Sequence, residues 1–153
     1  MRFSNREQLG LRAMVEFARR YDNGFTSLVE VAEAQGISLS YMEQVVMPLR
    51  LANLLESRRG VHGGYSLARP PEQITAGDVI RALKGPLVPI RCLVDDESVE
   101  DCVRQARCET RIVWLKVRQR LEEALNSITL ADLLEQNISS PDEQSCDITD
   151  ESW

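Results

Sequence analysis

Residues 36–70 read GISLSYMEQVVMPLRLANLLESRRGVHGGYSLARP. A glycine-led turn opens a helix with a polar outer face, and a hairpin rich in arginine and glycine follows directly. This order predicts a winged helix-turn-helix, which places one helix in the DNA major groove and a β-ribbon against the backbone or the minor groove. The stretch therefore makes DNA binding the leading hypothesis.

The helix within this stretch is predicted at about residues 39–52, with Ser38 as its N-cap. One apolar stripe is expected to pack inward: Tyr41, Val45 and Leu49. A second face is formed by residues that recur at helical spacing: Ser40, Glu43, Gln44 and Met47. Buried carboxylate and amide groups need partners, so the second face is expected to point outward, toward DNA. Pro48 removes one helical hydrogen bond and is expected to kink the helix near its end.

The polar face offers the chemistry that base recognition needs. Glu43 can accept a hydrogen bond from cytosine N4, and Gln44 can pair with adenine N6 and N7. Ser40 can bind a base edge or a phosphate, and Tyr41 can send its hydroxyl to a phosphate while its ring packs inward. A merely solvated helix surface is the alternative, but the position between the turn and the wing favours DNA.

The wing is predicted as two short strands, residues 55–57 and 65–67, joined by a glycine-rich tip. Arg59 is the best candidate for a narrow minor groove, where the negative potential is enhanced. Arg58 is expected to contact phosphate. Gly60 allows the turn and close approach of the backbone. His62 is the only histidine in the chain and is expected to face DNA or solvent.

The whole chain is predicted to be mainly α with a small β wing. Further helices are expected at residues 5–21, from a cap at Thr26 or Ser27 to Gly36, and at 74–83, 109–127 and 129–135. Four regions follow: a DNA-binding domain at 1–84, a cysteine-containing loop at 85–108, a dimerisation helix with a short terminal helix at 109–136, and an acidic disordered tail at 137–153.

The late helix carries a long apolar stripe: Trp114, Val117, Leu121, Leu125 and Ile128. Its residues repeat at spacings of three and four, as in helices that pack on another helix. In a small protein such a helix is typical of a homodimer interface. A core helix packed within its own chain is the alternative.

Charge is distributed unevenly over the 153 residues, whose net charge is −6. The tail holds five acids and no Lys or Arg, and without it the net charge is −1. The segment 57–69 carries three arginines and no acid, so the basic charge lies where the wing is predicted. There is no apolar run long enough to span a membrane, and no secretory leader is visible, so a cytoplasmic protein is expected.

Three of the four cysteines cluster with the spacing Cys92-x9-Cys102-x5-Cys108, and Cys146 lies in the tail. A cytoplasmic protein is not expected to use them as a disulfide framework. Zinc sites usually contain close C-x2–4-C pairs, which are absent here. Widely spaced thiolates suit an iron–sulfur cluster, although buried unpaired cysteines remain the alternative at this point.

Several motifs occur together in one order: GLRAM (10–14), GISLSYMEQ (36–44), LESRRGVHGGYSLARPPEQIT (55–75), GDVIRAL (77–83), the three cysteines and ITLADLL (128–134). In this the chain resembles the Rrf-type bacterial winged helix-turn-helix regulators, the family that includes IscR, NsrR, RirA and CymR. The resemblance covers about residues 1–136. It implies a homodimer crossed by a long C-terminal helix, and in many members an iron–sulfur cluster, [2Fe–2S] or [4Fe–4S].

The resemblance also implies a ligand set for that cluster. Cys92, Cys102 and Cys108 stand where the cluster-binding members have their cysteines. IscR-like members add a histidine three residues after the last cysteine, but Arg111 stands there. NsrR-like members use a carboxylate from the first helix of the other subunit, at the position of Gln8. Glu7 and Glu109 are neighbouring oxygen donors, and water or a small thiol is a further option.

The sequence therefore predicts a homodimeric transcriptional regulator that binds near-palindromic DNA. Through the cluster the regulator would sense cluster status, iron, redox state or nitric oxide. It is assumed to be a repressor, although the residues do not show whether it represses or activates transcription. A regulator of this family controlled by a partner protein, a small molecule or thiol oxidation is the alternative. An iron–sulfur carrier that binds no DNA is a remote one. No catalytic constellation is present, so an enzyme is not expected.

Overall fold

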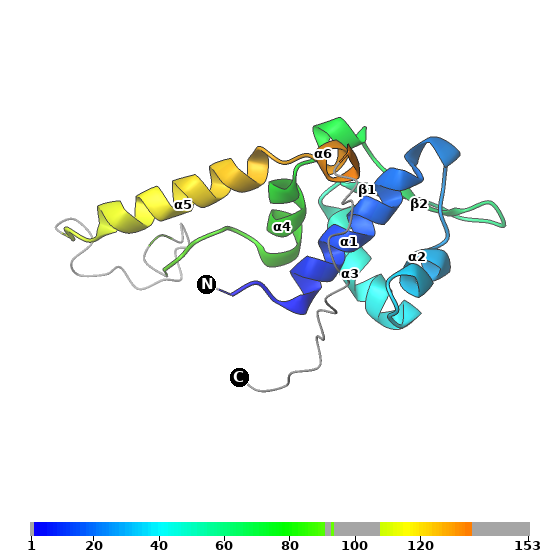
Figure 1. Ribbon diagram of the computed structural model, residues 1–153. Coiled ribbons are helices and arrows are strands. Elements are labelled where there is room, and N and C mark those ends of the chain that lie inside the picture. Colours follow the sequence, from blue (N-terminus) through cyan, green and yellow to red (C-terminus); the bar gives the residue numbers. More distant parts are fainter. Residues whose placement is uncertain (1, 91–92, 94–107, 136–153) are drawn as a thin grey trace, which may run out of the picture.

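The computed structural model describes residues 2–90, 93 and 108–135. Ten elements follow one another in these residues: α1 (Asn5–Arg19), η1 (Tyr21–Asn23), α2 (Leu28–Ala34), α3 (Leu39–Leu51), β1 (Leu55–Arg58), β2 (Gly64–Leu67), η2 (Pro71–Gln73), α4 (Ala76–Lys84), α5 (Arg111–Asn126) and α6 (Leu130–Glu135). Figure 1 shows α1 to α4 and the hairpin gathered in one body, from which α5 extends away. The prediction of a mainly helical chain with a small β wing is confirmed.

Short polar side chains fix where several helices begin. Ser27, not Thr26, caps α2 by accepting a hydrogen bond from the amide of Val29 at 3.3 Å. Ser38 caps α3 in the same way through the amide of Tyr41. Thr75 caps α4 and forms a reciprocal capping box with Asp78. These local signals explain why most helix starts could be predicted closely.

The ends of the helices differ more from prediction. α1 ends at Arg19 instead of Tyr21, because a short 3-10 turn covers Tyr21–Asn23 before Gly24. α2 ends at Ala34, and Gly36 follows with φ +65°, a left-handed conformation that glycine adopts without strain. The amide of Ile37 then bonds to the carbonyl of Ala32 at 3.1 Å. This fixes the tight turn between α2 and α3.

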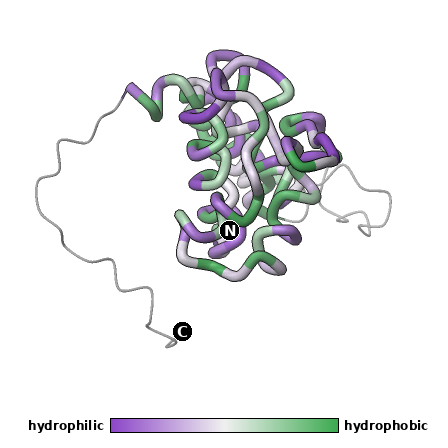
Figure 2. Tube along the Cα trace, turned by 90° about the vertical axis from the view of Figure 1, so that its right-hand side faces the viewer, coloured by the Kyte–Doolittle hydropathy of each residue, from purple (hydrophilic) through white to green (hydrophobic). Residues whose placement is uncertain are grey.

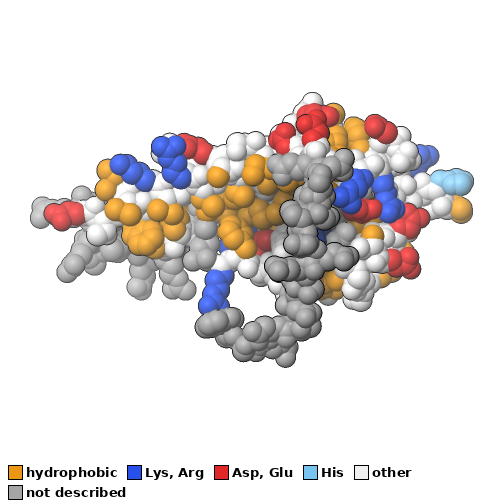
Figure 3. Space-filling view, viewed as in Figure 1, with side chains coloured by type: hydrophobic (Ala, Val, Ile, Leu, Met, Phe, Trp, Pro, Cys, Tyr) orange, Lys and Arg blue, Asp and Glu red, His pale blue; other side chains and the backbone are white. Residues whose placement is uncertain are grey.

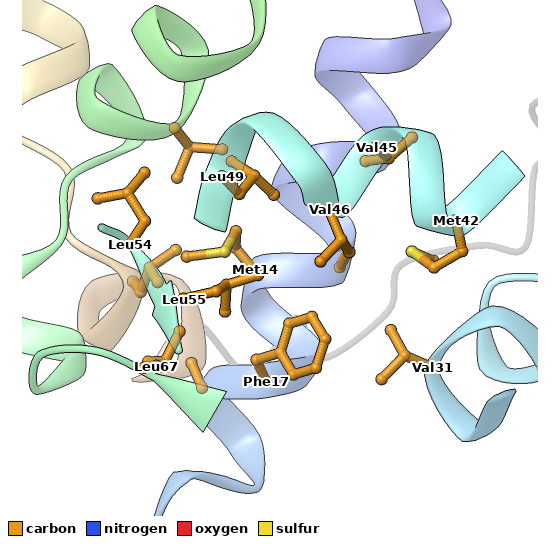
Figure 4. Packing of buried hydrophobic residues seen from close by; sticks show 14 of the residues in the cluster. Met14, Phe17, Val31, Met42, Val45, Val46, Leu49, Leu54, Leu55 and Leu67 are labelled. Carbon is orange, nitrogen blue, oxygen red and sulfur yellow. The ribbon is translucent and has the colours of Figure 1, made fainter. Parts of the chain in front are cut away.

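One hydrophobic core joins α1, α2, α3 and the hairpin (Figure 4). Its largest fully buried side chains include Phe17 and Met14 from α1 and Leu67 from β2. From α3 the buried residues are Met42, Val45, Val46 and Leu49. The predicted inward stripe is therefore right for Val45 and Leu49 but missed Met42 and Val46, and Tyr41 is only half-buried.

The wing is a two-stranded antiparallel sheet. β1 and β2 pair with Leu55 opposite Leu67 and Arg58 opposite Gly64, one residue longer at the tip than predicted. Thr26 adds two backbone bonds of 2.8 Å to Tyr65, so the turn before α2 is tied to the second wing strand. The wing is thus attached to the helix-turn-helix by backbone as well as by core packing.

The end of the described chain returns to the core. Thr129 pairs with Thr75 in an isolated bridge, and Leu130 of α6 is fully buried. Residues 130–135, predicted as a short terminal helix after the dimerisation helix, form α6 and pack against α1 and the core. Figure 2 shows hydrophobic and hydrophilic residues alternating along the helical turns, as in helices with one buried face. In the described residues no helix is long and apolar enough to cross a membrane.

Candidate nucleic-acid interface

The outer face of α3 carries the predicted base-contacting residues on the surface. Ser40, Glu43 and Gln44 are all exposed, while the opposite face of the helix is buried in the core. Met47, 53% exposed, continues the same face. Ser38 is also exposed, but its hydroxyl is already engaged as the helix cap. Tyr41 is half-buried and packs against the core, but it is less buried than its neighbour Met42.

A hollow of about 610 Å³ lies along this face. It is lined by Arg6, Ser40, Tyr41, Glu43, Gln44, Met47, Pro48 and Leu51. Polar groups occupy one end, and Met47 with Leu51, which is 72% exposed, forms an apolar end. Apolar side chains of this kind are suited to the C5-methyl group of thymine. Neither Leu51 nor Arg6, which enters from α1, was among the residues predicted from the sequence to contact DNA.

The wing presents its two arginines differently. The guanidinium of Arg58, at the end of β1, lies 5.9 Å from the ring centroid of Phe25, within the range of a cation–π contact. Arg59 is exposed at the tip, and within the described residues it makes no hydrogen bond or ion pair. Gly60 and His62 are exposed beside it, with Gly60 at φ +113°. Arg59 is therefore the arginine that the fold leaves available for a ligand.

Close backbone packing holds the wing at one angle to α2. Gly64 has φ +146°, and a Cβ atom on it would lie 2.2 Å from the carbonyl oxygen of Thr26. Any side chain at this position would push β2 away from the turn before α2. On the other strand, Arg50 of α3 donates to the hydroxyl of Ser57 at 3.3 Å. These contacts relate the wing tip to the polar face of α3.

Only part of the cysteine site lies within the described residues. Cys92 and Cys102 fall outside them, as does Cys146. Cys108 is half-buried just before α5, with its sulfur 3.2 Å from the hydroxyl oxygen of Thr110 and its carbonyl accepting the amide of Arg111. Glu109 is exposed beside it. Within the ranges that the structure describes, no group of three metal-ligating side chains occurs.

The oxygen donors expected from the first helix lie elsewhere. Glu7 is buried, and its carboxylate accepts hydrogen bonds from the hydroxyl (2.6 Å) and the amide of Ser4 in a capping box. Burial raises the pKa of Glu7, but the bonds from Ser4 and the charge of Lys84 outweigh it and hold the pKa below its usual value. Gln8 is exposed next to it.

Glu7 and Cys108 of one chain lie at opposite ends of α5. Glu7, Gln8 and Leu125 line one hollow of about 290 Å³. Leu125 is near the end of α5, whereas Cys108 precedes its start, and a helix of this length spans about 24 Å. The same chain therefore does not bring Glu7 or Gln8 to Cys108 (Figure 1).

Comparisons with known proteins agree with this geometry. The family profile for Rrf2, described as an iron-dependent transcriptional regulator, matches residues 3–136. The chain belongs to the Rrf2 family. It is 41% identical to the HTH-type transcriptional regulator CymR of Bacillus subtilis over 87% of this chain and 89% of that protein. It is 39% identical to the regulator IscR of Sodalis glossinidius over 88% and 79% of the two chains.

A solved structure shares the fold of this Rrf2-family chain. The structure of B. subtilis CymR, titled the global cysteine regulator, aligns with a TM-score of 0.71 and 39% identity over 88% of this chain and 97% of that one. The predicted family and the winged helix-turn-helix fold are thereby confirmed. The chain is a DNA-binding transcriptional regulator, and its relatives are regulators, not enzymes.

In this Rrf2-family regulator, α5 is joined to the DNA-binding body by its last residues. Arg81 of α4 donates to Asp78 at 2.8 Å and to Asn126 of α5 at 2.9 Å. The amide of Ala76 bonds to the carbonyl of Ile128 at 2.8 Å. The end of α5 is therefore fixed to α4, and further along the helix Arg118 donates a hydrogen bond to the carbonyl of Leu93 at 3.3 Å.

The extended part of α5 leaves its apolar side chains uncovered. None of its residues is buried within the part of the chain that the structure describes. The exposed hydrophobic residues are Ile112 (59%), Val113 (53%), Trp114 (37%), Leu115 (43%) and Val117 (43%). Figure 3 shows hydrophobic side chains gathered along this helix. Within the described residues, these side chains are not covered by the rest of the chain.

Proposed function

We propose that this regulator binds near-palindromic operator DNA as a homodimer, and that an iron–sulfur cluster held by Cys92, Cys102 and Cys108 controls its affinity. The exposed polar face of α3 beside an exposed wing arginine carries the DNA-binding part of the proposal. The protein would act in the cytoplasm.

In this proposal α3 enters the major groove. Glu43 accepts from cytosine N4, and Gln44 forms two hydrogen bonds with adenine. Ser40 binds a base edge or a phosphate, and the Tyr41 hydroxyl binds a phosphate. Ser38 supports them chiefly by capping the helix that presents them. The helix amides near Ser38 are further donors for a phosphate.

The wing supplies the second contact. Arg59 enters the minor groove, where its charge is favoured by the negative potential. Arg58, supported by the ring of Phe25, contacts the adjoining phosphate. Gly60 lets the tip approach the backbone, and His62 flanks the contact. The wing and α3 of one subunit together contact one half-site of the operator.

The second half-site requires a second subunit. Several hydrophobic side chains of α5 are exposed in the described residues, and a copy of the same helix would cover them. A dimer holds its two α3 helices at a spacing near one turn of DNA, about 34 Å. Because α5 is fixed to α4 through Arg81 and Asn126, the angle between the α5 helices would set this spacing.

The donor set fits an iron–sulfur cluster. Cysteine thiolates are the usual ligands of such clusters, and of the three proposed ligands Cys108 lies within the described residues, half-buried just before α5. When bound, the cluster would supply a redox-active and oxygen- or nitric-oxide-reactive centre. Glu109 is the neighbouring oxygen donor of the same chain. Glu7 or Gln8 could contribute only from the second subunit, and Glu7 would first have to leave its capping box with Ser4.

Control would act through the position of α5. The cysteine loop precedes α5 directly, so changes at Cys108 and Arg111 act on the beginning of this helix. A shift of α5 relative to its copy changes the half-site spacing and therefore the affinity for a fixed operator. Whether the bound state represses or activates depends on the position of the operator.

A second candidate is control without a cluster. The 41% identity to B. subtilis CymR, which is described as a global cysteine regulator, favours this option. The cysteines would then act in thiol oxidation, or a partner protein or small molecule would bind instead. Iron and sulfide content separates the two candidates.

The test is anaerobic purification from iron-replete cells, followed by binding to the upstream region of the protein's own gene. Cluster binding predicts a brown protein whose absorbance at about 320–420 nm is lost in Cys102→Ala. Operator affinity should differ between protein with and without the cluster. A colourless protein with intact thiols would favour the second candidate, and a brown protein that binds no DNA would favour a carrier.

A further inference from the structure

Pro48 leaves a gap in the hydrogen-bond ladder of α3. In an α-helix the amide of residue 48 bonds to the carbonyl of residue 44, but proline has no N–H. The Gln44 carbonyl therefore lacks its helical donor. This carbonyl belongs to one of the proposed base-contacting residues, on the exposed face of the helix.

Arg6 supplies the missing donor from another helix. Its Nη2 atom donates to the carbonyl oxygen of Gln44 at 3.2 Å, across 38 positions of sequence. The bond is charge-assisted, and such bonds are stronger than neutral ones. The guanidinium also lines the hollow on the outer face of α3, beside Gln44, Met47 and Pro48. One arginine of α1 thus reaches the carbonyl that proline leaves open.

We propose that Arg6 is a positioning residue for base recognition: it replaces the hydrogen bond that Pro48 removes and so fixes the Gln44 segment of α3 relative to α1. The inference rests on the proposed binding of DNA by α3. In this proposal Arg6 affects base recognition without contacting a base, and it compensates for the hydrogen bond that Pro48 removes from the recognition helix.

The first turn of α1 is built to hold Arg6 in place. The capping box between Ser4 and Glu7 closes this turn on either side of Arg6. Lys84 of α4 donates to the carbonyl of Arg2 and lies 5.5 Å from the ring centroid of Phe3. The backbone that carries Arg6 is therefore attached to α4 as well.

Other residues of this turn line a second hollow. Ser4, Glu7 and Gln8 line the 290 Å³ hollow together with Ile80 of α4 and Leu125 of α5. A ligand or a second subunit that enters this hollow contacts the residues on both sides of Arg6. Displacement of this turn would move Arg6 and would therefore change the hydrogen bond between Arg6 and the Gln44 carbonyl. The position of Arg6 thus provides a short connection between the α5 region and the base-contacting face.

A double-mutant cycle in the full chain tests this connection. The variants are Arg6→Ala, Pro48→Ala and the two combined, with Arg12→Ala as the matched control, because Arg12 is an exposed arginine of the same helix. The probe is a DNA duplex selected by the wild-type protein from a random library. Pro48→Ala restores the helical donor, so it should make Arg6 dispensable.

We expect Arg6→Ala to weaken binding about tenfold, the lower end of the effect of one hydrogen bond to a charged group. The same change in the Pro48→Ala background should have less than about a twofold effect. Selection repeated with Arg6→Ala should show relaxed preference at the base contacted by Gln44, which a general loss of stability would not produce. Arg12→Ala should match the wild type in all three measurements.

Two outcomes would overturn the assignment. Equal weakening by Arg6→Ala in both backgrounds, with the slope of log affinity against log salt reduced by about one, would make Arg6 a phosphate contact instead. Unchanged affinity and preference would mean that Arg6 has no role in binding.

If the wild type selects no DNA, the proposed function fails. Amide hydrogen exchange then tests the contact between Arg6 and α3 by itself: Arg6→Ala should speed exchange in the last turn of α3 only when Pro48 is present.

Discussion

The DNA-binding body and α5 differ in how far their hydrophobic side chains are buried. In the body, α1, α2, α3 and the wing bury their apolar faces against one another, with Phe17 1% exposed. α5 buries none of its side chains within the described residues, although five of its hydrophobic residues are 37–59% exposed. The first region is complete within one chain. The second leaves its hydrophobic side chains exposed within the described residues.

The difference assigns different sources of stability to the two regions. In the body, stability comes from hydrophobic packing, from helix caps and from close backbone contacts such as Gly64 against Thr26. For α5, packing is proposed to come from the second copy of the chain. Substitutions in the two regions should therefore affect different measurements, unfolding in one case and association in the other.

Phe17→Ala should have the largest effect on the free energy of unfolding, because Phe17 belongs to the buried core of the body. Removal of a fully enclosed ring from the core is expected to cost about 3–5 kcal/mol of unfolding free energy. Denaturant unfolding followed by circular dichroism measures it. Val61→Ala is the control, because Val61 is 98% exposed and should change stability by less than about 0.5 kcal/mol. Equal stability of the two variants would contradict the assigned core.

Trp114→Asp combined with Val117→Asp should disrupt association without unfolding the body. Sedimentation should show a monomer, and operator affinity should fall about 100-fold or more, because the two half-sites are no longer linked. Lys116→Glu, on a different face of the same helix, is the control and should remain dimeric. A double variant that stays dimeric would place the interface elsewhere.

Arg59→Ala should weaken operator binding by about 1–3 kcal/mol while leaving stability and dimerisation unchanged. The reason is that Arg59 lies exposed at the wing tip, with no bond to lose among the described residues. A mobility-shift titration at physiological salt measures the effect. Arg120→Ala on α5, whose side chain is 83% exposed, is the control. Identical affinities for the two variants would remove Arg59 from the interface.

Asp78→Asn should have the smallest effect, and one that depends on pH. Burial raises the pKa of Asp78, but bonds from the Thr75 amide, Arg81 and the Thr75 hydroxyl outweigh it and lower the pKa overall. The carboxylate therefore stabilises the fold above the usual aspartate pKa, and this contribution is lost as the pH falls through the lowered value. The effect at neutral pH should be below about 1 kcal/mol.

Unfolding measurements at a series of pH values test this prediction. The difference between wild type and Asp78→Asn should shrink below about pH 4. Glu72→Gln, an exposed carboxylate in the preceding turn, is the control and should show no such trend. A difference that persists unchanged at low pH would mean that the Asp78 carboxylate does not support the start of α4.

Local patterns predicted most of the elements. The caps at Ser38 and Thr75, the turn at Gly36 and the hairpin with its glycines depend on residues a few positions apart, and the sequence shows these directly. The outward face of α3 followed from helical spacing, because charged and amide groups avoid burial. Within that helix, the spacing alone did not distinguish Tyr41 from Met42 as the inward residue.

The sequence alone determined the winged helix-turn-helix, its polar face and the presence of a late helix with an apolar stripe, because spacing and capping are local. Only the tertiary structure decided which distant residues meet. It placed Arg6 against Gln44, buried Leu130 in the core and separated Glu7 from Cys108 by the length of α5. Such contacts depend on how whole helices pack, and no local pattern encodes that arrangement.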